Sequence, residues 1–193
     1  MSEEERDLVL ALRRGDRGAF DRAYARHAPA VFSFLLRLTR RRDVAEDLHQ
    51  ETWVKLARKA PDLAEDTRLV AWLFTVARNA FVSERRWAML DLTRIFAFGA
   101  EASTHAEGDL EGQTDARRKV SALEDALGAV SPTAREVLLL VAVEGLEQAD
   151  VARILDLSAE ALRQRLSRAR KELEARLEGM PRAAKTDVRR ERA

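Results

Sequence analysis

The segment 147–171 constrains the fold most strongly, because its sequence predicts two helices joined by a tight turn. Three apolar residues share one face of the first helix: Val151, Ala152 and Leu155. Asp156 and Leu157 form the turn, and Ser158 is a favourable N-cap for the helix that follows. That second helix carries an apolar stripe at helical spacing: Leu162, Leu166, Ala169, Leu173 and Leu177. The layout is typical of a helix-turn-helix, whose second helix enters the DNA major groove.

The opposite face of this second helix is polar and basic. At about 100° per residue, it carries Arg163, Gln164, Ser167, Arg168 and Lys171. Amide and guanidinium groups reach base edges, and Lys and Arg also neutralise phosphates. We therefore predict that these five residues contact DNA. The alternative is an ordinary solvated helix face.

The rest of the chain is also helical in pattern, without strand-like alternation, which predicts an all-α fold. The expected helices are 3–14, 17–39, 43–59, 69–88, 117–129, 132–144, 147–155 and 159–178. Between the two sets of four, the stretch 91–116 holds six acidic residues, one basic residue and three glycines. We expect two small helical bundles joined by a flexible acidic linker.

This organisation predicts four segments: a first domain at 1–90, a linker at 91–116, a second domain at 117–178, and a basic, disordered tail at 179–193. The linker includes a short apolar patch of Ile95, Phe96 and Phe98. Three interpretations of this patch stay open: it packs on a domain, contacts a partner, or extends the preceding helix.

Composition narrows the function further. The 193 residues carry a net charge of only +1 and no cysteine, so the chain has no disulfide and no thiolate metal site. The three histidines, His27, His49 and His105, are scattered, and we expect no metal, no cofactor and no catalytic residue. The longest apolar run, 137–143, is too short to span a bilayer, and no signal peptide is evident. The expected location is the cytoplasm, without membrane insertion.

The helix expected at 43–59 has two distinct faces. Its inward face holds Ala45, Leu48, Thr52 and Leu56. Its outer face gathers Asp47, Gln50, Glu51 and Val54 at spacings of i, i+3, i+4 and i+7. Acid and amide groups around one exposed valine suit a contact with another protein, although a solvated face is the alternative.

The helix expected at 69–88 has a core stripe of Leu69, Leu73, Val76 and Ala80. A second stripe about 120° away holds Thr75, Asn79, Val82 and Arg86, with Trp72 and Arg78 at its edges. Polar, basic and aromatic groups together suit single-stranded or melted nucleic acid. The alternative is that Trp72 is simply a core aromatic.

Four motifs in this order resemble a known family: GDRGAF at 15–20, AEDLHQETW at 45–53, AWLFTVARN at 71–79 and RLSRAR at 165–170. The chain resembles the sigma-70 family of bacterial transcription initiation factors. Its short length is similar to that of the smallest subgroup, the extracytoplasmic function (ECF) sigma factors. The resemblance covers nearly the whole chain and implies an ECF sigma factor that directs core RNA polymerase to promoters.

The resemblance also implies a partner for each face. The outer face at Asp47, Gln50, Glu51 and Val54 is expected to bind the β′ clamp helices of core polymerase, and the second domain the β flap. Arg163, Gln164, Ser167, Arg168 and Lys171 are expected to contact the −35 promoter element. A flipped −10 base is expected to meet the loop from Leu63 to Leu69 and the helix after it, through Leu63, Thr75, Arg78, Asn79 and Arg86. An anti-sigma factor is a further expected partner.

Three positions depart from the family pattern. Asp156 stands where a turn glycine is common, although Asp tolerates a left-handed backbone better than most residues. Ser83 replaces a common aspartate, and Glu160 opens a Glu-Ala-Leu run where a Gly-Thr-Val-like run is usual. These changes predict unusual −10 and −35 preferences.

Two other classes of function stay open at this point. A stand-alone helix-turn-helix regulator would bind duplex tightly by itself, but it leaves the two first-domain faces unexplained. An enzyme of nucleic-acid metabolism would need a carboxylate cluster, a phosphate-binding loop or a nucleophile–histidine pair, and the sequence offers none of them.

Overall fold

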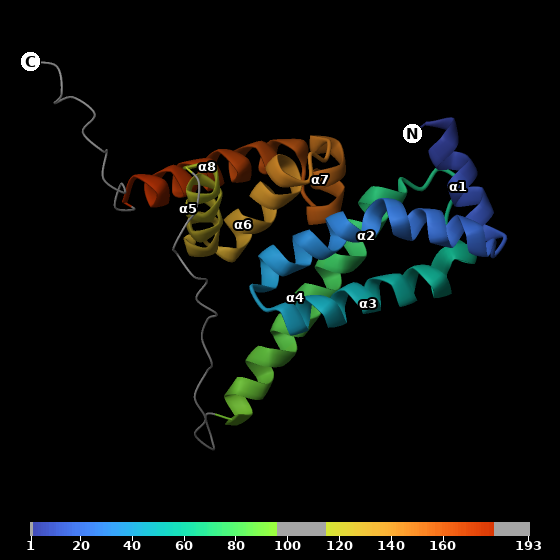
Figure 1. The fold of residues 1–193 in the computed structure, drawn as a ribbon, viewed down its shortest axis with the longest axis horizontal. Coiled ribbons are helices and arrows are strands. Elements are labelled where there is room, and N and C mark those ends of the chain that lie inside the picture. Colours follow the sequence, from blue (N-terminus) through green and yellow to red (C-terminus); the bar gives the residue numbers. More distant parts are fainter. Residues whose placement is uncertain (1, 96–114, 180–193) are drawn as a thin grey trace, which may run out of the picture.

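The computed structural model describes residues 2–95 and 115–179, and the regular elements within these ranges are helical, as predicted. The first half contains α1 (Glu3–Arg13), α2 (Arg17–Thr39), α3 (Arg42–Lys59), a 3₁₀ turn (Ala60–Asp62) and α4 (Leu69–Ile95). The second half contains α5 (Asp115–Ala129), α6 (Pro132–Leu138), a π-helical turn (Leu139–Val143), α7 (Gln148–Leu155) and α8 (Ala159–Gly179). Figure 1 shows the two sets of helices in contact with each other.

Short polar side chains fix several helix starts. Asp16 Oδ1 accepts a hydrogen bond from the Ala19 amide at 3.2 Å, at the start of α2. Ser131 Oγ accepts from the Ala134 amide at 3.3 Å, with Pro132 at the first helical position of α6. Both caps satisfy amides that have no partner inside the helix. The predicted start of the sixth helix is therefore confirmed.

The first half is built around α4, which packs on α2 and α3 on one side and on α7 on another. The predicted core stripe of α4 is buried, and so is the predicted inward face of α3. Further buried residues of α4 were not predicted: Ala71, Phe74, Ala77 and Phe81. They are buried because this central helix has neighbours on more than one face. Trp72 is half-buried against the same core, which favours its reading as a core aromatic.

The second half is organised by α8, which packs on α5, α6 and α7. Leu162, Leu166 and Ala169 are buried, and Leu173 is partly buried against them. Leu177, the last residue of the predicted stripe, is 40% exposed, so this part of the prediction was wrong. The C-terminal end of α8 runs past the helices on which it packs (Figure 1), so burial is incomplete there.

The two halves pack against each other, whereas the sequence predicted separate bundles on a tether. Arg68 Nη1, just before α4, lies 3.0 Å from a carboxylate oxygen of Glu147 and 3.0 Å from one of Asp150. Arg78 Nε of α4 lies 2.8 Å from Glu136 Oε1 of α6. One continuous group of buried apolar residues includes members from both halves. Helical periodicity gives no signal for such pairs, because their members lie far apart in the chain.

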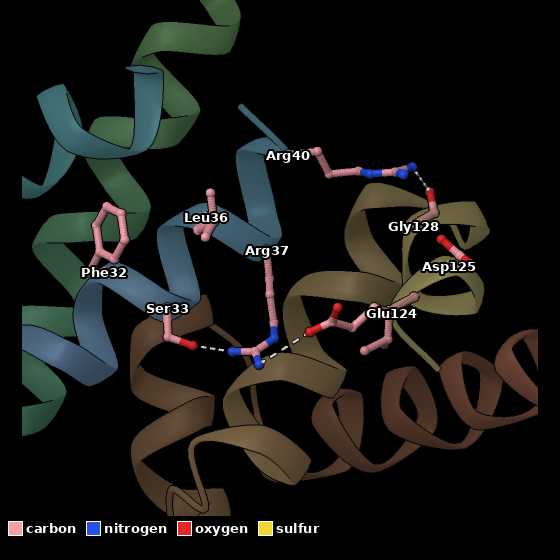
Figure 2. Close-up of a pocket in the computed structure, with 9 residues that line it drawn as sticks. Phe32, Ser33, Leu36, Arg37, Arg40, Glu124, Asp125 and Gly128 are labelled. Atoms are coloured by element: carbon pink, nitrogen blue, oxygen red, sulfur yellow. Dashed lines mark hydrogen bonds and ion pairs between the residues drawn. The ribbon is translucent and has the colours of Figure 1, made fainter. Parts of the chain in front are cut away.

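A second line of contact joins the end of α2 to α5 and α6 (Figure 2). Arg37 Nη2 lies 3.6 Å from Glu124 Oε1, and Arg40 Nη1 donates to the Gly128 carbonyl at 3.3 Å. A groove of about 430 Å³ runs between α2 and α5. The Arg40 backbone is left-handed, with φ of 57°, and this conformation ends α2.

Some helix boundaries in the structure differ from those predicted. Helix α4 continues to Ile95 and α5 begins at Asp115, so both ends of the expected linker are helical. The predicted helix at 132–144 changes from α to π geometry at Leu139. The rest of the linker, with Phe96 and Phe98, and the tail from 180 onward lie outside the described residues. Among the helices described, none combines the length and the apolar character needed to cross a bilayer.

Candidate nucleic-acid interface

Helices α7 and α8 form the predicted helix-turn-helix. Asp156 ends α7 in the left-handed region, with φ of 53° and ψ of 54°. Ser158 Oγ then accepts a hydrogen bond from the Ala161 amide at 3.1 Å and caps α8. The predicted turn and N-cap are both confirmed, and they fix the direction in which α8 leaves the turn.

All five residues predicted to contact duplex DNA are exposed along α8: Arg163, Gln164, Ser167, Arg168 and Lys171. They lie opposite the buried Leu162, Leu166 and Ala169, so packing of α8 leaves their side chains accessible. An exposed, polar and basic helix face of this kind can donate hydrogen bonds to base edges and phosphates.

One acidic residue, Glu160, joins this face beside the five residues predicted to contact DNA. Glu160 Oε1 accepts a hydrogen bond from Gln164 Nε2 at 3.1 Å, and Glu160 Oε2 forms an ion pair with Arg163. Hydrogen bonds from Arg163 and then from Gln164 lower the pKa of the Glu160 carboxyl. The i, i+3 and i+4 spacing was the available signal for this cluster.

The second predicted nucleic-acid face lies on α4, and its members differ in accessibility. Asn79 and Arg86 are exposed. Thr75 is half-buried, and its hydroxyl donates to the Ala71 carbonyl at 2.8 Å. The Arg78 side chain is 22% exposed and is held by the buried Glu136. In this arrangement the second half of the chain therefore occupies part of the α4 face.

Leu63 does not fit its predicted role in contacting a base. Its side chain is 5% exposed and belongs to the core. The preceding 3₁₀ turn directs it inward, with the Leu63 amide donating to the Ala60 carbonyl at 3.3 Å. A buried leucine is a structural residue of this loop, and the accessible groups of the loop lie at Ala64, Glu65 and Asp66.

The predicted protein-contact face of α3 is exposed at all four residues, Asp47, Gln50, Glu51 and Val54, the last with 40% of its surface accessible. A cluster of rings lies beside it on α2 and α3. Trp53 Nε1 donates to His49 Nε2 at 2.9 Å, and the Tyr24 ring centroid lies 4.8 Å from that of Trp53. Burial lowers the pKa of His49, which favours the neutral ring that accepts this bond. His49 is thus packed between α2 and α3.

Within the described residues, no group of three or more His, Asp or Glu side chains is placed to hold a metal ion.

Comparison with known proteins identifies the family. The model of sigma-70 region 2 matches residues 23–88, and the model of sigma-70 region 4 matches residues 121–173. The chain belongs to the sigma-70 family, in its ECF group. It is 32% identical to the RNA polymerase sigma factor CnrH of Cupriavidus metallidurans, over 92% of this chain and 97% of CnrH.

Two further similarities agree with this membership. The ECF RNA polymerase sigma factor EcfG of Rhodopseudomonas palustris is 32% identical, over 77% of this chain and 80% of EcfG. The sigma factor RpoE of Bartonella quintana, solved in complex with the anti-sigma factor NepR, superposes with a TM-score of 0.70 at 28% identity. That superposition covers 84% of this sigma factor and 98% of RpoE. The chain is thus a transcription initiation factor that directs RNA polymerase to promoters.

Proposed function

We propose that this ECF sigma factor reads the −35 promoter element as duplex through α8. The observation that carries the proposal is the exposed stripe of Arg163, Gln164, Ser167, Arg168 and Lys171 on the second helix of a capped helix-turn-helix. The N-terminal part of such a helix meets the base edges in the major groove. Arg163 and Gln164 lie in that part, whereas Lys171 is placed for phosphate.

The −10 element is captured in our proposal by the exposed face of α4. Asn79 is the principal candidate to hydrogen bond to a flipped base, with Arg86 on the backbone beside it. Extruding a base costs a few kcal/mol, so the pocket must provide both stacking and hydrogen bonds. Arg78 joins this face only when its ion pair with Glu136 is released.

Core polymerase binds in this proposal through the α3 face of Asp47, Gln50, Glu51 and Val54, which meets the β′ clamp helices. The second half meets the β flap. Exposed acid and amide groups around one accessible valine support a polar interface with a small apolar centre. Because core polymerase and the chromosome share the cytoplasm, the chain is proposed to act there.

Simultaneous reading of both elements requires the halves to separate. The two elements lie about 20 base pairs apart, or roughly 70 Å at about 3.4 Å per pair. Two touching compact units of 60–90 residues place their centres roughly 30 Å apart. The packed arrangement, with Arg68 against Asp150, is therefore proposed as the form that precedes polymerase binding.

An anti-sigma factor is the proposed ligand of this packed form. The superposition on RpoE, which was solved bound to NepR, extends over most of both chains. It therefore supports a similar placement of the two halves in this sigma factor. A ligand that binds the packed form better than the open form shifts the population toward it.

The −35 proposal is tested with two matched arginine variants in reconstituted holoenzyme. Arg163→Ala should weaken binding to a −35 duplex by about 1–3 kcal/mol if Arg163 makes a bidentate base contact. Arg176→Ala removes an exposed arginine near the end of the same helix and should leave base preference unchanged. Unaltered preference at every −35 position in Arg163→Ala would remove Arg163 from the readers.

A further inference from the structure

Glu160 places a carboxylate on the face of α8 that is proposed to read DNA. It is the second residue of α8 and shares a face with Arg163, Gln164 and Ser167, at i+3, i+4 and i+7. Its side chain is 61% exposed. Every other member of this face carries a hydrogen-bond donor or a positive charge, so the acid is the exception.

The contacts of Glu160 involve the two readers nearest the start of α8. One carboxylate oxygen accepts from Gln164 Nε2 at 3.1 Å, and the other pairs with the Arg163 guanidinium. The lowered pKa keeps this carboxyl ionised at neutral pH. Glu160 therefore contacts both readers in the absence of DNA.

Stabilisation of the helix start is an alternative role for Glu160. An acid in the first turn interacts favourably with the helix dipole. The Ala161 amide, however, already has Ser158 Oγ as its acceptor at 3.1 Å. Stabilisation through the helix dipole also needs no contact with Arg163 or Gln164. Loss of that stabilisation leaves the base preference unchanged, whereas loss of a base contact alters it.

A carboxylate near duplex DNA repels phosphates and so weakens binding to all sequences. The carboxylate is tolerated where a base edge offers it a hydrogen-bond donor. In the major groove, cytosine presents its N4 amino group, whereas guanine presents acceptors at N7 and O6 and thymine presents an acceptor at O4. Adenine presents its N6 amino group beside an acceptor at N7, which repels the second oxygen of a carboxylate. A carboxylate at this place thus favours cytosine over the other three bases.

We infer that Glu160 is a specificity-determining residue, which accepts a hydrogen bond from the N4 amino group of a cytosine in the −35 duplex and aligns Arg163 and Gln164 beside it. The inference rests on the proposed reading of the −35 element by α8.

The test is selection of −35 sequences from a randomised duplex library by reconstituted holoenzyme. The wild-type factor should select cytosine at one position, and Glu160→Gln should lower that preference about tenfold. The selected base should shift toward adenine, because a glutamine amide pairs with adenine N6 and N7. Binding to non-promoter duplex should become tighter, since a negative charge near the phosphates is lost.

Glu178→Gln is the matched control, since it removes one exposed carboxylate about 27 Å further along α8. It should select the same sequences as the wild-type factor. Unfolding of each variant is followed in parallel by circular dichroism.

The outcomes distinguish a failure of the inference on Glu160 from a failure of the proposed reading of DNA by α8. If Glu160→Gln keeps the wild-type preference at every position while Arg163→Ala alters it, α8 reads DNA and Glu160 does not select bases. A loss of helix stability with unchanged preference assigns Glu160 to the helix dipole and equally overturns the inference. If neither variant alters the selected sequence, the proposed reading by α8 fails.

Discussion

Glu144 follows the π-helical turn and has an unusual environment for an acid. Within the described residues no group hydrogen bonds to its buried Oε1 atom, and burial raises the pKa of the carboxyl, with a smaller opposing effect of Arg37. Folding therefore favours the protonated form of this side chain. Its contribution to stability is present at low pH and is lost as the pH rises through the raised pKa.

Glu144→Gln is expected to remove this pH dependence. Relative to the wild-type protein, the variant should gain free energy of unfolding as the pH rises from about 4, the ordinary pKa of a glutamate, through the raised pKa. Urea unfolding at a series of pH values measures the difference. Two profiles that stay parallel over this range would show that the carboxyl titrates normally.

The burial or exposure of individual residues was predicted well where it depends only on their position around one helix. The buried and exposed faces of α3, and the five exposed residues of α8, follow from helical spacing alone. Leu63 and Arg78 were misplaced because their environments depend on distant parts of the chain. Leu63 enters a core formed by several helices, and Arg78 meets Glu136 from the other half.

At the scale of elements, the turn between α7 and α8 carries a small conformational cost. A left-handed backbone at Asp156 disfavours any residue with a Cβ atom, by about 1 kcal/mol. Glycine removes that cost but loses more entropy on folding. Asp156→Gly should therefore raise the free energy of unfolding by about 0.5 kcal/mol. Thermal unfolding measures it, and a lower melting temperature than wild type would contradict the expectation.

The exposed face of α3 is predicted to bind core polymerase. Changing Asp47 and Gln50 together to alanine should weaken binding to core polymerase roughly tenfold, while the helical content stays unchanged. Both residues are exposed, so their truncation leaves the core intact. Titration of labelled sigma factor with core polymerase gives the affinity.

Asp7→Ala, on the exposed side of α1, is the control for that titration and should bind as the wild type does. Equal affinity of the α3 double variant and this control would exclude the α3 face from the polymerase interface.

For the whole molecule, the packing of the two halves depends on ion pairs that span them. Glu136 is buried in α6, and its partner in the described structure is Arg78 of α4. Removal of one member of a largely buried pair leaves the other charge without compensation, at a cost of several kcal/mol when burial is complete. The pair is only partly covered on the arginine side, so a cost of about 1–3 kcal/mol is expected.

Glu136→Gln should therefore shift the population toward separated halves. Small-angle X-ray scattering should give a larger radius of gyration than for the wild type, and circular dichroism should show that the helices remain. Glu174→Gln, at an exposed position of α8, should stay compact. An unchanged radius in Glu136→Gln would mean that this pair does not hold the halves together.

The helical class, the order of the helices and the helix-turn-helix were predictable, because they rest on local periodicity and capping residues. The packing of the halves was not, because Arg68 and Asp150 lie on segments whose patterns show no link between them. The acidic stretch between the halves suggested a free tether, whereas the buried charges of α6 and α7 find their partners on the first half.

In our proposal α8 and α4 read two promoter elements while polymerase carries the chain. The most direct test adds the full chain to bacterial core RNA polymerase and a set of promoter fragments. We expect a stable holoenzyme and transcripts that depend on the fragment, with Arg163→Ala weakening those that rely on the −35 element and Asn79→Ala weakening opening at −10. The proposal fails if core polymerase without the chain gives the same transcripts at the same level. It also fails if no holoenzyme forms.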